Sequence, residues 1–72
     1  RDWLIPSRQY LANAYILKKD FLNAEKILKE DLVINPHNYH SLMMLKKIYQ
    51  PNKLKVTELQ KIDEELKENY NL

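Results

Sequence analysis

The sequence matches itself when it is shifted by 34 residues. Of the 38 residue pairs that this shift aligns, seven are identical, whereas composition alone predicts about two or three by chance. Apolar residues also meet in the same alignment, as Leu28 does with Ile62. Duplication of one short unit predicts two copies of a single supersecondary motif. The identical pairs are Ser7/Ser41, Leu11/Leu45, Tyr15/Tyr49, Lys19/Lys53, Glu30/Glu64, Leu32/Leu66 and Asn35/Asn69.

Apolar residues recur at intervals of three and four in both halves, which is the spacing of amphipathic helices. Asp20 and Asn38 are suitable N-caps, and Thr57 with Gln60 three residues later forms a capping box. No segment has the alternation of a half-buried strand. The sequence therefore predicts an all-α fold with four helices, at residues 6–18, 21–34, 39–50 and 57–69.

The connections between the predicted helices are short. Two residues join the first pair and about four join the second helix to the third. Such lengths make neighbouring helices antiparallel. We therefore expect two helical hairpins that pack side by side.

The first copy carries a recognisable set of large and small residues: Leu11, Ala12, Tyr15, Ala24, Leu28 and Pro36. This set resembles the tetratricopeptide repeat, a helical hairpin of 34 residues that stacks into an α-solenoid. The resemblance implies one domain over residues 1–72. Residues 1–5 would lead in from an upstream region, 6–38 would form the first repeat, and 39–72 would form a degenerate second repeat that caps the stack.

Several positions depart from the family pattern. Arg8 replaces an aromatic residue, Asp31 stands where a small alanine is usual, and Lys19 stands in a turn where glycine is common. A positive φ at Lys19 would cost about 1 kcal/mol. In the second copy, Lys46 and Glu58 replace both small residues, which fits a terminal cap.

Three short motifs give a second likeness: Trp3-x-x-Pro6-x-Arg8, Glu30-Asp31-Leu32 and Asn35-Pro36. Together they are similar to the C-terminal repeat segment of some larger bacterial repeat proteins. The likeness implies that upstream repeats of the same chain are a partner of this segment, since about two repeats rarely suffice alone.

The composition excludes several kinds of site. The chain has no cysteine, which excludes disulfides and thiolate zinc sites, and no glycine, which excludes Gly-rich phosphate loops and the nucleophile elbow. No apolar run approaches the ~18 residues of a spanning helix, so no membrane partner is expected. A net charge of +2 is too small to indicate a nucleic acid by itself.

The polar residues show no catalytic pattern. His37 and His40 lack a third ligand, so neither a metal nor another cofactor is expected. Ser7 and Ser41 are best explained by helix starts, because no base is placed to activate them. The acidic run 63–65 stands among lysines at helical spacing, which is typical of a solvated face. The sequence therefore predicts that the protein is not an enzyme.

In tetratricopeptide proteins the first helix of each hairpin lines a groove that holds a protein segment. The resemblance thus implies a non-catalytic interaction or scaffold module that binds a peptide or protein. The alternative is a purely structural C-terminal cap of a larger repeat protein or enzyme, with no ligand of its own. Nucleic-acid binding is the weaker alternative and rests on five lysines between residues 46 and 61. The implied groove residues are Gln9, Asn13, Ile16 and Leu17 from the first helix, and His40, Met43 and Lys47 from the third.

Overall fold

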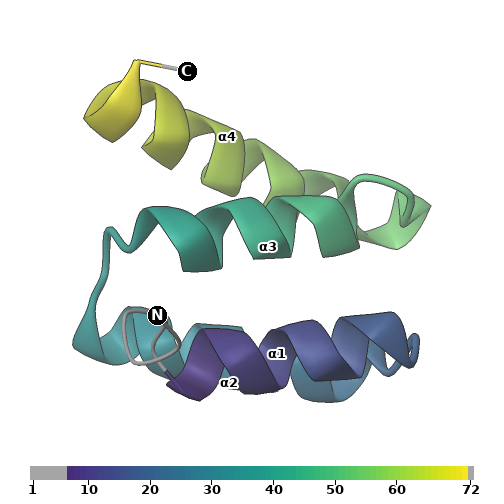
Figure 1. The fold of residues 1–72 in the computed structure, drawn as a ribbon. Helices are drawn as coiled ribbons and strands as arrows, with labels where there is room; N and C mark the ends of the chain where they lie inside the picture. Colours follow the sequence, from purple (N-terminus) through teal and green to yellow (C-terminus); the bar gives the residue numbers. More distant parts are fainter. Residues whose placement is uncertain (1–6, 72) are drawn as a thin grey trace.

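The computed structural model describes residues 7–71, and the regular elements within that range are all helical. The predicted all-α class is therefore confirmed for the described residues. Successive helices run in opposite directions (Figure 1), so the α1–α2 turn lies at the same end of the molecule as η2. The α2–α3 loop lies at the other end, together with the C-terminal end of α4. The elements are α1 (Ser7–Leu17), α2 (Phe21–Ile34), α3 (Tyr39–Tyr49), the 3₁₀ turn η2 (Lys53–Lys55) and α4 (Val56–Tyr70).

The helix bounds lie close to those expected from the sequence. Helix α2 has the predicted bounds, and α1 and α3 each end one residue earlier than predicted. The predicted start of the first helix at Pro6 lies outside the described residues. Helix α4 extends one residue beyond its predicted range at each end.

Two of the three predicted N-caps are present. The Asp20 side chain accepts a hydrogen bond from the amide of Asn23 at 3.4 Å, and the Asn38 side chain accepts one from the amide of His40 at 3.1 Å. The capping box at Thr57 was a wrong prediction, because α4 begins earlier and its N-cap residue, Lys55, makes no side-chain cap bond. The preceding turn is instead closed by Asn52, which starts η2 and leads directly into α4.

The tight turn between α1 and α2 places Lys19 in the left-handed region, with φ of 61°. This confirms the positive φ considered from the sequence. The amide of Lys19 donates to the carbonyl of Ile16, and the amide of Asp20 donates to the carbonyl of Tyr15, so the turn satisfies the last carbonyls of α1.

The core forms where the apolar stripes of the helices meet. Helix α1 packs on α2, α2 on α3 and α3 on α4, and α1 also contacts α3. On α2 the buried residues Ala24, Leu28 and Asp31 are spaced by four and three, so they share one face. The buried apolar residues are Ala12, Ala24, Leu28, Leu42, Leu45, Ile48, Tyr49, Ile62 and Leu66.

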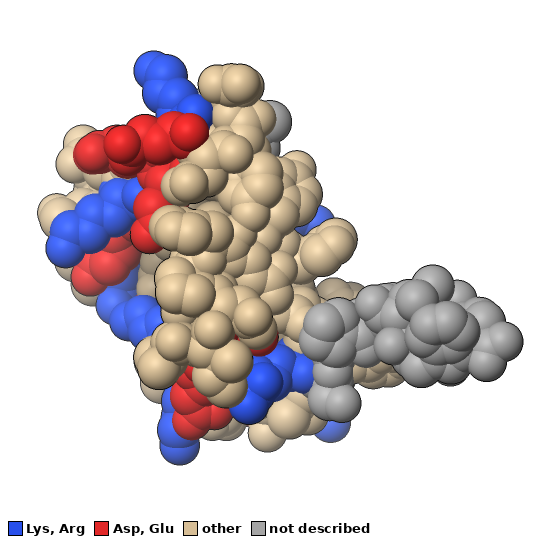
Figure 2. Space-filling model, turned by 90° about the vertical axis from the view of Figure 1, so that its left-hand side faces the viewer, with Lys and Arg blue, Asp and Glu red and all other residues tan. Residues whose placement is uncertain are grey.

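Charged side chains are unevenly spread over the surface. Viewed from the end that carries the α2–α3 loop, Lys, Arg, Asp and Glu gather along one edge and alternate in sign (Figure 2). The neighbouring face in this view is broad and carries other residues. Within residues 7–71, none of the helices combines the length and the apolar character needed to cross a bilayer.

Candidate functional site

The seven predicted groove residues belong to α1 and α3, and these two helices contact each other. Asn13 and Leu17 are exposed on α1, and His40 and Lys47 are exposed on α3. Asn13 and Lys47 are equivalent in the 34-residue alignment, so they occupy the same position of the two copies. The helix pair thus presents polar, apolar and basic side chains to solvent.

The other three predicted groove residues are partly or fully covered. Ile16 and Met43 are half-buried and pack against the core. Gln9 is buried, and its Nε2 donates a 2.6 Å hydrogen bond to Oγ of Ser41. Its amide therefore joins α1 to α3 and is not part of the accessible surface. The predicted surface reduces to Asn13, Leu17, His40 and Lys47, with the exposed parts of Ile16 and Met43.

A buried carboxylate lies directly beneath this helix pair. Asp31, on α2, is 1% exposed. Its Oδ2 accepts hydrogen bonds from Oγ of Ser41 at 2.6 Å and from Nδ2 of Asn38 at 2.8 Å, and its Oδ1 lies 3.5 Å from Nδ2 of Asn35. With Gln9, which donates to Ser41, these side chains form one network that we call the Asp31 network. It links α1, α2, the α2–α3 loop and α3.

The Asp31 network holds its carboxylate in the charged form. Burial raises the pKa of Asp31, but hydrogen bonds from Ser41, Asn38 and Asn35 outweigh that effect and leave the pKa below the ordinary value of 3.8. A carboxylate with a lowered pKa is a poor base, so Asp31 does not activate the Ser41 hydroxyl as a nucleophile. The geometry is that of a structural connection.

Sequence reasoning missed the Asp31 network, although part of its signal was present. Asp31 follows Ala24 and Leu28 at helical spacing, which places a charged residue on the buried face. A buried charge requires donors, and Asn35 and Asn38 follow at short range. The contribution of Ser41 was not predictable in this way, since the residue was expected at a helix start and instead lies buried inside α3.

A second polar cluster joins α2 to the C-terminal end of α3. The hydroxyl of Tyr49 donates to Oε2 of Glu25 at 2.5 Å, and Nζ of Lys29 and of Lys55 lie 3.3 Å and 3.6 Å from the same oxygen. Burial and the bond to Glu25 raise the pKa of Tyr49 above its ordinary value of 10.0. Burial also raises the pKa of Glu25, but hydrogen bonds from Tyr49 and Lys29 and the charge of Lys55 lower it more, to below 4.5.

Ion pairs engage part of the lysine concentration. Lys46 lies 3.0 Å from Asp63, and Lys55 lies within 4 Å of both Glu25 and Glu58. Two of the five lysines that suggested nucleic-acid binding therefore face carboxylates. Among residues 7–71, moreover, no three His, Cys, Asp or Glu side chains come together as a metal site would require.

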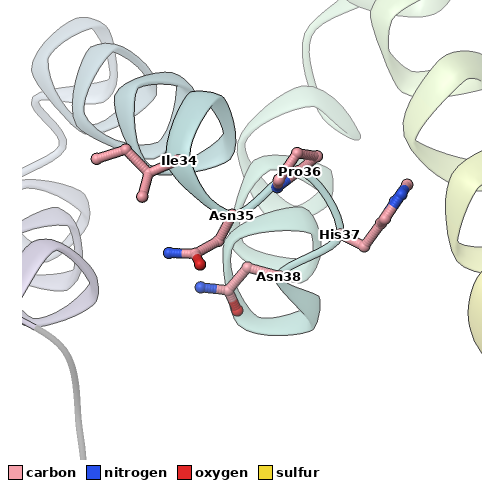
Figure 3. Close-up of a pocket in the computed structure, with 5 residues that line it drawn as sticks. All are labelled: Ile34, Asn35, Pro36, His37 and Asn38. Carbon is pink, nitrogen blue, oxygen red and sulfur yellow. The ribbon is translucent and has the colours of Figure 1, made fainter.

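An open hollow of about 510 Å³ lies at the α2–α3 loop (Figure 3). Asn35 and Asn38 point to the same side of the loop, where they reach Asp31, while His37 points away toward α4. His37 Nδ1 lies 3.5 Å from Oε2 of Glu65, and its carbonyl accepts a hydrogen bond from the hydroxyl of Tyr70. The polar groups of the loop are thus engaged within the fold. The hollow is lined by Ile34, Asn35, Pro36, His37 and Asn38.

No family model, no curated protein and no solved structure matches this chain. Its function must therefore be inferred from its own residues and their geometry.

Proposed function

We propose that the chain is a non-catalytic interaction module of tetratricopeptide type, which holds a peptide or protein segment along the exposed side of α1 and α3. The observation that carries the proposal is the contact between these two helices. Neighbouring helices that run in the same direction offer side chains at regular spacing, which suits an extended or helical ligand. The contact residues are Asn13, Leu17, His40 and Lys47, with Ile16 and Met43 at their base.

Correspondence between the two halves of the chain supports the repeat interpretation. α1 and α3 have 11 residues each, and α2 and α4 have 14 and 15. Leu28 and Ile62, which the shift of 34 residues aligns, are both buried, while Glu30 and Glu64 are both exposed. Equivalent positions therefore often share the same environment.

The outer side of α4 supports its role as a terminal cap. A solenoid ends where a helix turns a polar side to water, because no further repeat covers it. Five charged residues of both signs are exposed on α4: Lys61, Asp63, Glu64, Lys67 and Glu68.

The exposed side of α1 supports an additional helical neighbour. Leu11 is 49% exposed, whereas its equivalent Leu45 is 1% exposed. Ala14 is likewise exposed, while its equivalent Ile48 is buried. Positions that are covered in the second copy are thus open in the first, as expected if an upstream repeat packs there. This observation favours a second candidate function, in which the chain only caps a larger protein.

Selection of peptides followed by mapping of their contacts tests the interaction proposal. The immobilised chain would be offered a phage-displayed peptide library, and a selected peptide would be added to isotope-labelled protein. We expect amide shifts in α1 and α3, and weaker binding by Asn13→Ala and Lys47→Ala with unchanged helicity. Lys26→Ala, at an exposed position of α2, is the matched control and is expected to bind normally.

Two results would contradict the interaction proposal. Failure to select any peptide would leave the structural cap as the better explanation. Shifts confined to α2 or α4 would place the ligand on another surface. The weaker nucleic-acid alternative requires binding that falls steeply with added salt, because counterions are released from the phosphates.

A further inference from the structure

We propose that the end of the molecule formed by the α1–α2 turn and η2 docks on an anionic lipid bilayer. This surface, which we call the basic end, carries three aliphatic and three basic side chains. It is separate from the exposed side of α1 and α3, so the proposal does not depend on the interaction function. Its residues are Leu17, Lys18, Lys19, Leu22, Lys53 and Leu54.

The residues of the basic end are brought together by the fold. The α1–α2 turn and η2 lie at the same end of the molecule (Figure 1). Lys55, in η2, lies 3.6 Å from Glu25, in the second turn of α2, which places η2 beside the start of that helix. Lys19 and Lys53 are also equivalent in the two copies. Two successive connections therefore contribute the same kind of surface.

The aliphatic side chains of the basic end are unusually open. Leu22 is 81% exposed and Leu54 is 90% exposed, and Leu17 is exposed as well. Each belongs to a turn or to the first or last turn of a helix, so it projects from the end of the molecule. Exposed leucines grouped in this way mark a surface that binds something apolar.

The charges around these leucines indicate an anionic partner. Lys18, Lys19 and Lys53 form no ion pair with another described residue, so their charges face solvent. The nearby carboxylates are engaged. Asp20 accepts hydrogen bonds from Asn23, and Glu25 and Glu58 lie close to Lys55.

A bilayer interface fits this combination better than a protein does. Aliphatic side chains can enter the boundary between headgroups and acyl chains while adjacent lysines bind anionic headgroups. A protein partner would instead need pockets shaped for three separate leucines. A second copy of this chain is disfavoured, because its own lysines would repel those of the first. With three lysines, binding is expected to be weak, reversible and sensitive to salt.

Co-sedimentation of the whole 72-residue chain with vesicles tests the proposal. The vesicles would contain phosphatidylcholine alone or phosphatidylcholine with about 30% phosphatidylserine. We expect binding only to the second kind at low salt. The double substitution Leu22→Ser with Leu54→Ser should weaken it about tenfold. Lys18→Gln with Lys53→Gln should weaken it by about fivefold or more for each lysine.

Two variants at other sites serve as controls. Val33→Ser changes a residue that is 82% exposed near the opposite end of α2, and Lys61→Gln changes an exposed lysine of α4. Neither should alter binding more than about twofold. Failure of the native chain to bind anionic vesicles would overturn the proposal and leave a protein as the partner of the basic end. Equal losses in the Val33→Ser control would overturn it as well.

A spin label gives a second readout that does not depend on affinity. The chain has no cysteine, so Leu54→Cys and Val33→Cys each create a single labelling site. On anionic vesicles, a label at position 54 should become accessible to oxygen and protected from a water-soluble relaxation agent, whereas a label at position 33 should not. The same accessibility at both positions would count against docking by the basic end.

Discussion

Ser41 donates a 2.6 Å hydrogen bond from its Oγ to Oδ2 of Asp31 and thereby ties α3 to the buried face of α2. The contact is fully inside the molecule, since Ser41 and Asp31 are both buried. It gives the Asp31 network its central bond, because Ser41 also accepts a hydrogen bond from Gln9 of α1.

Removal of the Asp31 carboxylate should destabilise the fold strongly. Asp31→Ala leaves the Ser41 hydroxyl and the Asn38 amide without their acceptor in a buried site, at a cost of about 2–4 kcal/mol. Urea unfolding followed by circular dichroism would measure this loss. Glu30→Ala, at the exposed neighbouring position, should change stability by less than about 0.5 kcal/mol. Equal midpoints for the two variants would mean that the network contributes little.

Acid should weaken the protein through the same carboxylate. The pKa of Asp31 is lower in the folded state than its ordinary value, so the unfolded chain binds more protons as the pH falls. The stabilisation is complete well above the ordinary pKa of 3.8 and is lost as the pH drops through the folded-state pKa. Glu25 behaves in the same direction. In unfolding titrations between about pH 5 and pH 3, Asp31→Asn should lose less stability with each pH unit than the native chain does. A slope as steep as that of the native chain would contradict this assignment.

Tyr49 should show the opposite dependence on pH. Burial and the bond to Glu25 raise its folded-state pKa, so its contribution is present below the ordinary value of 10.0 and is lost as the pH rises toward the folded-state pKa. Ultraviolet titration of the five tyrosines should reveal one that ionises late and together with unfolding. Tyr49→Phe should remove that late step and cost about 1–3 kcal/mol, because Glu25 loses a donor. A late step that survives in Tyr49→Phe would belong to another tyrosine.

The strained turn between α1 and α2 should be improved by glycine. Lys19 has a φ of 61°, which glycine adopts without the clash of a Cβ, so Lys19→Gly should stabilise the fold by about 0.5–1 kcal/mol. Thermal unfolding would detect the gain. Lys18→Gly is the control, since Lys18 is not among the residues with positive φ, and it should be neutral or destabilising. A lower melting temperature for Lys19→Gly would show that the lysine itself stabilises the turn.

The observed caps predict an unequal response to alanine. Asp20→Ala should destabilise the protein by about 1 kcal/mol, because the Asn23 amide loses its acceptor. Thr57→Ala should cost less than about 0.5 kcal/mol, because α4 begins before Thr57 and its N-cap residue makes no side-chain bond. Urea midpoints for the two variants would separate these expectations. A larger loss for Thr57→Ala would restore the capping box.

Local signals predicted the helices well. The bounds of α2 follow from Asp20 at its start and from Asn35-Pro36 after its end, and both signals lie in adjacent residues. The start of α4 was misplaced because Thr57 and Gln60 satisfy a common pattern, while Asn52 closes a 3₁₀ turn that no periodicity announces.

The candidate site was less predictable because its contacts join distant parts of the chain. Gln9 was assigned to an open groove by its place in the repeat, but its side chain turns toward Ser41, 32 residues away. Tyr49 and Glu25 are 24 residues apart, and nothing near either residue indicates the other. Such pairs depend on how the helices pack, which spacing along one helix does not specify.

The Asp31 network has a mechanical consequence for the helices that it joins. Leucine and alanine contacts can be remade after one helix slides along another, since they depend little on direction. A slip of one turn, about 5.4 Å, would strand the carboxylate of Asp31 away from the hydroxyl of Ser41 and leave a bare charge in the interior. The network therefore indexes α1, α2 and α3 to a single axial alignment, much as a key locks a wheel to its shaft.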